Sequence, residues 1–206
     1  MGLTSTSTGA GAADTALVLR RERPDDRIVA LAGNPNVGKS TVFNALTGLR
    51  QHTGNWAGVT VSCAMGQFSY GGQDFSAVDL PGIYSFDTRS AEEELTKDFI
   101  LNEDYDFLLV VCDATCLERG LYLLSQAAGL LEHREEAGPM PQAVLCVNLC
   151  DEAEKKGIRI DFKALERSLG IPVTPCCGRT AKGLLTLKKL LASLAASCPC
   201  ACASCS

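Results

Sequence analysis

Short, continuous apolar runs alternate with longer amphipathic stretches along most of the chain. Apolar runs bounded by turn residues are typical of strands buried on both faces of a parallel sheet, and two of the runs, joined by Gly71-Gly72, predict a hairpin. The predicted strands lie at about 28–32, 65–70, 75–80, 107–112, 143–147 and from 171 onward. Six strands with helices between them predict a three-layer α/β/α fold around a mostly parallel sheet.

Helices are expected where apolar residues recur every three or four positions. The first of these helices ends near Thr47, and others span 87–101, 117–132, 162–169 and 184–195. A short charged segment after the strand at 143–147 is also expected to be helical. The polar, Gly-rich residues 49–62 predict a surface loop. Residues 1–27, rich in Thr, Ser, Gly and Ala, predict a disordered leader, and 196–206 form a Cys-rich tail. The folded domain is therefore expected to span 28–195.

Composition and charge narrow the class of protein. The chain has 206 residues, 46% of them hydrophobic, and a net charge of −5. A general nucleic-acid-binding protein would carry a basic excess, so nucleic acid is not an expected partner. The apolar runs are far shorter than the ~20 residues that cross a bilayer, and no secretory signal is visible. The chain as given is therefore expected to be cytoplasmic.

The eleven cysteines fall into two groups. Cys112 and Cys146 lie within predicted strands, where a reduced thiol acts as a small hydrophobic group, as expected of a cytosolic protein. Four others, at 198, 200, 202 and 205, crowd the end of the chain. Such soft ligands suit Zn²⁺ or Cu⁺, but no scaffold flanks them, and a disordered tail is the favoured interpretation.

The first apolar run leads into Gly33–Ser40, which has the spacing G-x-x-x-x-G-K-S of a phosphate-binding loop. In such a loop, backbone N–H groups face inward as an anion-binding nest, and the following helix directs its positive end at the same point. Lys39 is expected to bind the β- and γ-phosphates, and Ser40 to ligate Mg²⁺. The residues predicted to surround the phosphates are Gly33, Asn34, Asn36, Val37, Gly38, Lys39, Ser40 and Thr41.

A second motif, Asp79-Leu80-Pro81-Gly82, follows 39 residues after Ser40. A carboxylate at Asp79 can hold Mg²⁺, and the backbone N–H of Gly82 can approach the γ-phosphate because no side chain intervenes. By itself the motif would be interpreted as a plain turn. After a phosphate-binding loop it indicates a nucleoside triphosphate site.

The nucleotide base is indicated by Asn148-Leu149-Cys150-Asp151, which closes the strand at 143–147. The carboxylate of Asp151 can accept hydrogen bonds from N1–H and the N2 amine of guanine, a pair that adenine lacks. Asn148 can tether the base edge and the loops around it. Leu149 stands where GTPases usually have Lys, so weaker stacking on the base is expected.

A last base-contact loop is expected after the final strand, at 177–183. GTPases usually have Ser-Ala there, and this chain has Gly178-Arg179. Backbone N–H groups of these two residues are the predicted contacts to the guanine oxygen.

The chain resembles the N-terminal cytosolic G domain of the FeoB-type ferrous iron transporters over roughly residues 28–195. The stretches that carry the resemblance are NPN at 34–36, HTGNWAGVTV at 52–61, DLPGIYS at 79–85, LERGLYL at 117–123 and DEAEKKGIRID at 151–161. The stretch at 52–61 is more specific than the motifs that all GTPases share. The resemblance implies a Ras-like GTPase of the P-loop NTPase fold.

The resemblance also implies two switch segments that order around the γ-phosphate and relax on hydrolysis. The first would span 50–62, where Gly58 and Val59 contact the nucleotide and Thr60 supplies a second Mg²⁺ ligand. The second would span 82–90. Members of the family continue into a helical segment and a membrane domain that carries Fe²⁺.

The catalytic group that orients water in Ras-like enzymes is missing, because Ile83 follows Gly82 where those enzymes have Gln. Slow intrinsic hydrolysis is therefore expected. The resemblance implies a role for Asn36 in holding K⁺ against the phosphates, with loop shaping by its side chain as the alternative. The residues assigned to catalysis are Lys39, Asn36, Thr60 and Gly82.

The function that these patterns favour is a GTP-hydrolysing switch domain that regulates Fe²⁺ uptake. A soluble ribosome- or RNA-associated GTPase and a nucleotide-binding interaction module with negligible turnover are the alternatives. The expected partners are GTP, GDP and the membrane domain of a ferrous iron transporter, and homo-oligomerisation stays open. As part of a full-length transporter, the domain would lie at the cytoplasmic face of the inner membrane.

Overall fold

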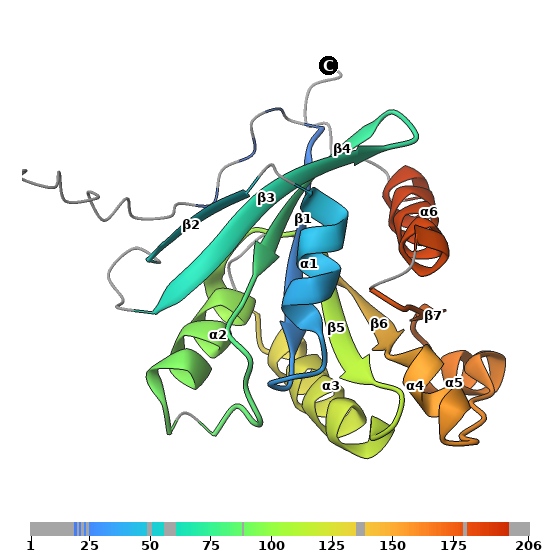
Figure 1. Cartoon of the computed structure of the whole chain (residues 1–206). Helices are drawn as coiled ribbons and strands as arrows, with labels where there is room; N and C mark the ends of the chain where they lie inside the picture. Colours follow the sequence, from blue (N-terminus) through green and yellow to red (C-terminus); the bar gives the residue numbers. More distant parts are fainter. Residues whose placement is uncertain are drawn as a thin grey trace, which may run out of the picture.

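The structure is a computed structural model, and it describes residues 19, 21, 23, 25–48, 51–55, 61–87, 89–134, 139–178 and 181–197. Its strands are β1 (Arg27–Gly33), β2 (Gln51–Asn55), β3 (Ser62–Tyr70), β4 (Gln73–Asp79), β5 (Phe107–Asp113), β6 (Gln142–Asn148) and β7 (Val173–Pro175). They form one sheet in the order β2-β3-β4-β1-β5-β6-β7 (Figure 1).

The sheet is parallel from β4 to β7 and antiparallel at its other edge. Strand β1 pairs in parallel with β4 and β5, and β5, β6 and β7 continue the parallel pairing. Strand β3 pairs antiparallel with β2 and β4. The carboxyl ends of the parallel strands consequently lie along one edge, where α/β proteins bind ligands.

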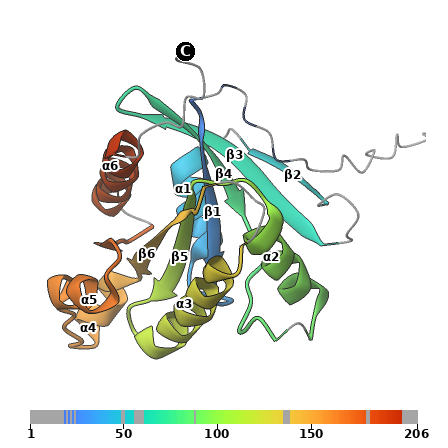
Figure 2. The same cartoon turned by 180° about the vertical axis from the view of Figure 1, so that it is seen from behind.

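Helices cover both faces of the sheet, as Figures 1 and 2 show from opposite sides. They are α1 (Lys39–Thr47), α2 (Ala91–Asn102), α3 (Leu117–Glu132), α4 (Cys150–Lys155), α5 (Phe162–Leu169) and α6 (Ala181–Ser197). Val42 of α1 and Leu187 of α6 are buried in the core on one face, and Phe99 of α2 and Leu123 of α3 in the core on the other. The expected α/β/α layering is confirmed.

The sheet has seven strands rather than the six expected, because part of the predicted loop at 49–62 is the edge strand β2. This strand pairs with β3 from Gln51 opposite Gly66 to Asn55 opposite Ser62. His52 and Thr53 are exposed, so the strand gains backbone hydrogen bonds without burying an apolar face. A polar edge strand carries no hydrophobic alternation, and the pattern therefore did not indicate it.

Helix α2 begins at Ala91, four residues later than expected, because its cap lies at Ser90. The Ser90 hydroxyl accepts from the N–H of Glu93, and the Glu93 carboxylate accepts from the N–H of Arg89. This is a variant of the capping box, and the Ser-x-x-Glu spacing was visible in the sequence. Three successive glutamates, Glu92–Glu94, further stabilise the positive end of the helix.

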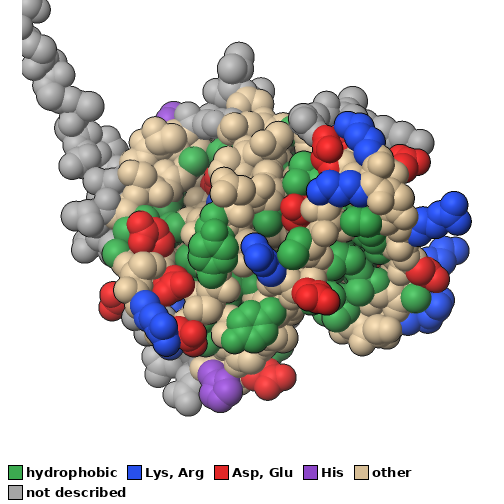
Figure 3. All heavy atoms as spheres, turned by 60° about the horizontal axis from the view of Figure 1, so that its bottom comes forward, with side chains coloured by type: hydrophobic (Ala, Val, Ile, Leu, Met, Phe, Trp, Pro, Cys, Tyr) green, Lys and Arg blue, Asp and Glu red, His purple; other side chains and the backbone are tan. Residues whose placement is uncertain are grey.

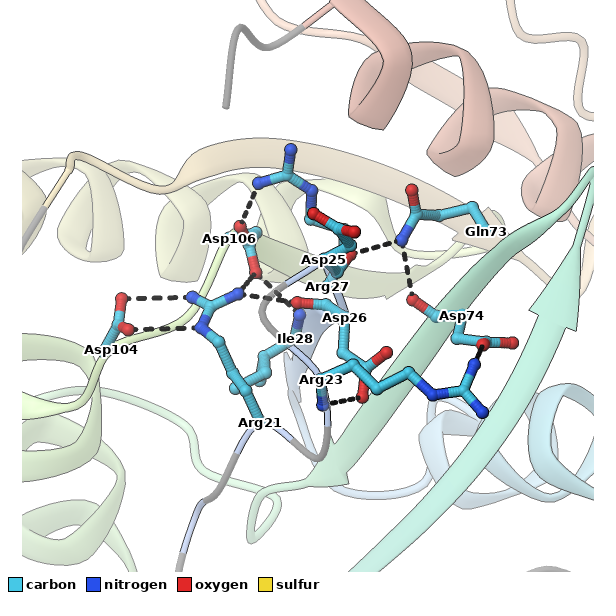
Figure 4. A network of polar contacts seen from close by, with 10 residues as sticks. All are labelled: Arg21, Arg23, Asp25, Asp26, Arg27, Ile28, Gln73, Asp74, Asp104 and Asp106. Atoms are coloured by element: carbon cyan, nitrogen blue, oxygen red, sulfur yellow. Dashed lines mark hydrogen bonds and ion pairs between the residues drawn. The ribbon is translucent and has the colours of Figure 1, made fainter. Parts of the chain in front are cut away.

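The amino end of β1 is held by a network of ion pairs that begins within the predicted leader (Figure 4). Arg21 and Arg27 both donate to the carboxylate of Asp106, at 2.7 Å and 2.9 Å. The same carboxylate accepts from the backbone N–H of Ile28 at 2.7 Å. The Asp106 side chain is only 13% exposed, so these contacts together compensate its burial.

Other described residues of the expected disordered leader are also tied to the domain. Asp26 is 7% exposed, Arg23 pairs with Asp74, and Gln73 donates to the carbonyl of Asp25. The contacts of Arg21, Arg23 and residues 25–27 thus differ from the expectation of disorder up to residue 27. Of the Cys-rich tail predicted at 196–206, residues 198–206 lie outside the described residues, whereas Ala196 and Ser197 continue α6. No helix of the described ranges has both the length and the apolar composition needed to cross a bilayer.

The network at the amino end of β1 generates a stability prediction. Replacing Asp106 with Ala leaves two guanidinium groups and a backbone N–H without their acceptor, and should lower the free energy of unfolding by about 2–3 kcal/mol in urea titrations. The matched control is Asp104→Ala, which removes an ion pair to Arg21 from a carboxylate that is 59% exposed, and should cost less than about 0.5 kcal/mol. Equal losses in the two variants would contradict the assignment.

Candidate functional site

The predicted motifs meet at the edge of the sheet where the parallel strands end. Gly33 ends β1, Asp79 ends β4 and Asn148 ends β6. The loop after β7 reaches the same place, since the N–H of Gly178 donates to the side chain of Asn148. Figure 3 views the molecule from this side. Three motifs far apart in the sequence therefore form one site, as expected.

The phosphate-binding loop connects β1 to α1 with two residues in the left-handed region. Asn36 has φ 66° and Gly38 has φ 82°. A Cβ atom at Gly38 would lie 2.4 Å from Nδ2 of Asn148, so glycine is required there for space as well as for conformation. Asn tolerates left-handed backbone better than most residues, which fits the loop-shaping alternative for Asn36.

Lys39 lies at the first position of α1 and is buried, 7% exposed. Its ammonium group contacts the carboxylate of Asp79 and the backbone carbonyl of Leu80. The positive charge of the loop and the carboxylate expected to hold Mg²⁺ are therefore already adjacent. Burial, with a further contribution from the Asp79 charge, raises the pKa of the nearby Cys63 thiol to about 11, which leaves this cysteine protonated at neutral pH.

An open hollow of about 490 Å³ lies over the start of α1. Ser40 and Thr41 are exposed at its floor. Its lining residues are Asn34, Pro35, Asn36, Gly38, Lys39, Ser40, Thr41 and Gly82. All except Pro35 were predicted to contact the nucleotide, and their roles toward it stay predictions.

The start of the predicted second switch is attached to the phosphate-binding loop. The N–H of Ile83 donates to the carbonyl of Gly33 at 3.1 Å, and the Asn34 amide donates to the carbonyl of Ile83 at 3.0 Å. A Cβ at Gly82 would lie 3.2 Å from the backbone of Pro35, so the two segments touch. Ile83 is 2% exposed and packs in the core, where it anchors the segment.

The side chain of Asn148 joins the two ends of the site. It is 1% exposed, its Nδ2 donates to the carbonyl of Val37 at 2.9 Å, and its Oδ1 accepts from the N–H of Gly178 at 3.0 Å. One buried amide thus fixes the phosphate-binding loop and the loop after β7 relative to β6. These contacts show the tethering of the loops that was predicted for Asn148, and its contact with the base edge stays a prediction.

The residues after Asn148 form the other end of the site. Leu149 has φ 60° and precedes the first turn of α4, an unusual conformation for leucine that marks a constrained position. The Asp151 carboxylate accepts a hydrogen bond from the thiol of Cys177, with 3.3 Å between Oδ1 and Sγ. Asp151 and Gly178 therefore approach the same space from α4 and from the loop after β7.

Four predicted contacts, Gly58, Val59, Thr60 and Arg179, lie outside the described residues. Two contacts were not anticipated from the sequence: the bond from the Asn34 side chain to Ile83, and the bond from Cys177 to Asp151. Both bonds join loops that are distant in the chain, so no local sequence pattern predicts them. The position of Cys177 at the start of the predicted base-contact loop was the one available signal.

Comparison with known sequences decides the family. The family model described as "Ferrous iron transport protein B" matches residues 27–191. The chain belongs to this family. It is 44% identical over 164 residues to the Fe(2+) transporter FeoB of Shigella flexneri and, equally, to that of Escherichia coli K12. These alignments cover 78% of this chain but 20% of each transporter, so the chain spans about a fifth of the length of these relatives.

Solved structures of the family share the fold. The cytosolic domain of the T. maritima FeoB iron transporter, in its apo form, superposes with a TM-score of 0.74 at 40% identity, covering 82% of this chain and 64% of that one. Its GMPPNP form matches equally well. The FeoB G-domain of Methanococcus jannaschii gives a TM-score of 0.69 at 39% identity, covering 84% and 99% of the two chains. The expected family and the P-loop GTPase fold are thus confirmed.

The bridging role of Asn148 generates a second stability prediction. Asn148→Ala leaves the carbonyl of buried Val37 and the N–H of half-buried Gly178 without this partner, and should lower the free energy of unfolding by about 2–3 kcal/mol in a urea titration. Asn102→Ala is the matched control, since that exposed amide contacts only Asp98 within the same helix, and should change stability by less than about 0.5 kcal/mol. A loss for Asn148→Ala no larger than the control's would show that the bridge contributes little.

Proposed function

We propose that this chain is the GTP-binding and slowly GTP-hydrolysing switch domain of a ferrous iron transporter, and that it regulates Fe²⁺ uptake. The observation that supports this most is the Asn148 side chain, which joins the phosphate-binding loop to the loop beside Asp151. The ribose limits the distance between the phosphates and the base of a nucleotide, and a buried amide is suited to hold two loops within that distance. Fe²⁺ itself would be carried by the rest of the transporter, as cargo.

The nucleotide proposed is GTP, with GDP as product. The T. maritima cytosolic domain has been solved in GMPPNP and GDP forms. We propose that this chain binds the same class of nucleotide. Asp151 is the residue that would distinguish guanine from adenine, because a carboxylate accepts from both N1–H and the N2 amine. Gly178 and Arg179 would present backbone N–H groups to the guanine oxygen, and Leu149 would pack on the base.

The residues around Lys39 fit a bound Mg²⁺. The carboxylate of Asp79 already accommodates a cation, the ammonium of Lys39, and the Ser40 hydroxyl is exposed at the adjacent position. Carboxylate and hydroxyl oxygens are the hard ligands that Mg²⁺ prefers, and Thr60 would add a third oxygen from the first switch. Bound Mg²⁺ supplies charge neutralisation on the phosphate oxygens. Lys39 would exchange Asp79 for the phosphates when nucleotide enters.

Hydrolysis is proposed to be slow because Ile83 offers no group that orients water. The Ile83 side chain is also buried in the core, away from solvent. Catalysis would then rest on Lys39, the backbone N–H of Gly82, Thr60, and Asn36 with K⁺. The absence of a water-orienting group at Ile83 also supports the competing function, a binding module with negligible turnover.

An RNA-associated GTPase is the weaker candidate. In Figure 3, the basic side chains that adjoin one another at the right-hand edge have acidic ones beside them, and the other described Lys and Arg side chains of this face are separated by acidic and hydrophobic ones. RNA-binding surfaces instead gather basic side chains into one patch. The proposed partner is therefore the membrane domain of the same transporter, with this domain at the cytoplasmic face of the membrane.

The base assignment is tested by exchanging the acceptor for a donor. Asp151→Asn should weaken GTP binding at least about tenfold, because a charged acceptor of two hydrogen bonds is lost, and should strengthen binding of xanthosine triphosphate, whose C2 carbonyl accepts from the new amide. Calorimetric titration with GTP, ATP and xanthosine triphosphate measures this. Glu154→Gln, an exposed change on the same helix, is the control. Wild-type protein that binds ATP more tightly than GTP would overturn the assignment.

The role of Asn36 is tested through its backbone conformation. Asn36→Gly keeps the left-handed φ of 66° without a side chain, so it separates ion binding from loop shaping. If the Asn36 side chain holds K⁺, wild-type phosphate release should be several-fold faster in K⁺ than in Na⁺, and the variant should lose this difference. A variant that keeps the K⁺ stimulation would leave loop shaping as the role. No phosphate release in either salt would favour the binding module.

A further inference from the structure

The Asn34 side chain lies between the phosphate-binding loop and the predicted second switch. Asn34 is 5% exposed, and its Nδ2 donates to the carbonyl of Ile83 at 3.0 Å. The preceding residue, Gly33, accepts from the N–H of Ile83 at 3.1 Å. Two consecutive residues of the loop therefore bind both backbone polar groups of one residue of the switch.

We propose that Asn34 is a positioning residue for GTP hydrolysis: its amide holds Ile83 against the phosphate-binding loop and thereby keeps the neighbouring Gly82 N–H where the γ-phosphate binds. The inference rests on the proposed function, because it requires a nucleoside triphosphate in the hollow over the start of α1. It gives the Asn34 side chain a role other than direct contact with the phosphates, since the amide is bonded to the switch.

Gly82 is held on both sides by residues that are bonded to β1 or to the loop. On one side, the N–H of Leu80 donates to the carbonyl of Leu31 at 3.1 Å, and Leu80 is buried. On the other side, Ile83 is held by its two bonds to the loop. Gly82 itself lines the hollow, and its N–H has no hydrogen-bond partner among the described residues. This donor is therefore positioned and available for a ligand oxygen.

The two bonds to Ile83 have different effects on the backbone. Because peptide groups are planar, the bond to the Ile83 N–H fixes the peptide group between Gly82 and Ile83, and the bond to the Ile83 carbonyl fixes the next one. With both bonds present, the backbone cannot turn about either of them. Without the Asn34 amide, only the bond to Gly33 remains, and the segment that carries the Gly82 N–H gains freedom to turn.

The hydrogen bonding of Asn34 favours positioning over stabilisation as its role. Its Oδ1 is buried and has no hydrogen-bond partner among the residues that the structure describes. A buried acceptor without a partner costs at least as much stability as one hydrogen bond contributes, so the Asn34 amide adds little net stability. Asn148 differs in this respect, because both polar atoms of its amide are bonded.

The test compares the full wild-type chain with Asn34→Leu and Asn34→Ala. Leucine has the same number and branching of side-chain heavy atoms as asparagine but cannot donate, and alanine removes the side chain without risk of overpacking. The non-glycine residues of the described chain with left-handed backbone are Asn36 and Leu149, so neither change at position 34 strains the backbone. Asn44→Ala, an exposed change on α1, is the matched control and should behave as wild type.

Single-turnover phosphate release from saturating GTP with Mg²⁺ should be at least about fivefold slower in both Asn34 variants, as expected for the loss of one positioning hydrogen bond. Affinity for GMPPNP should fall in calorimetric titrations, whereas affinity for GDP, which has no γ-phosphate, should stay within about twofold of wild type. Hydrogen exchange at the Ile83 N–H should become faster relative to the amides of β5. The midpoint of urea unfolding should be nearly unchanged.

Three results would overturn the inference. Both variants could hydrolyse bound GTP at the wild-type rate, or lose GDP affinity as strongly as GMPPNP affinity, or unfold at a markedly lower urea concentration, which would show a structural role. A wild-type chain that binds neither GDP nor GMPPNP would instead refute the proposed function. Wild-type binding without measurable turnover would refute the hydrolytic part of that function, and the positioning role with it.

Discussion

The arrangement of the site depends on one buried amide, the side chain of Asn148. It contributes one donor to Val37 and one acceptor to Gly178, and both partners are backbone groups of loops that are distant in the chain. Because an unpaired buried polar group is costly, the three segments hold one another in place. The same amide explains why position 38 requires glycine, since any side chain there would collide with it.

A second, electrostatic constraint operates at the phosphate end. Lys39 is buried against Asp79 and the carbonyl of Leu80, so the charges that would bind phosphate and metal neutralise each other. The Asn34 amide and the carbonyl of Gly33 hold Ile83 at the start of the second switch. The start of the second switch is therefore joined to the phosphate-binding loop by hydrogen bonds, the kind of contact through which the proposed switch would respond to nucleotide.

The two ends of the site differ in the kind of control they offer. The phosphate end depends on charge, and it responds to the ligand that arrives there. The base end depends on the shape and hydrogen bonding of a loop in which Cys177 touches Asp151. The chain spans about a fifth of the length of these transporters, and under the proposed function both ends are positions at which regulation would act.

The sequence by itself determined the family, the α/β/α layering and the positions of the phosphate and base motifs, because each depends on a local pattern: glycine spacing, buried apolar runs and short polar motifs at strand ends. Only the tertiary structure decided which residues meet. The edge strand β2 and the contacts of Arg21 carry no hydrophobic periodicity, since backbone pairing and ion pairs form between segments distant in the chain. The bonds from Asn34 to Ile83 and from Cys177 to Asp151 exist for the same reason: folding, not spacing, brings their partners within reach.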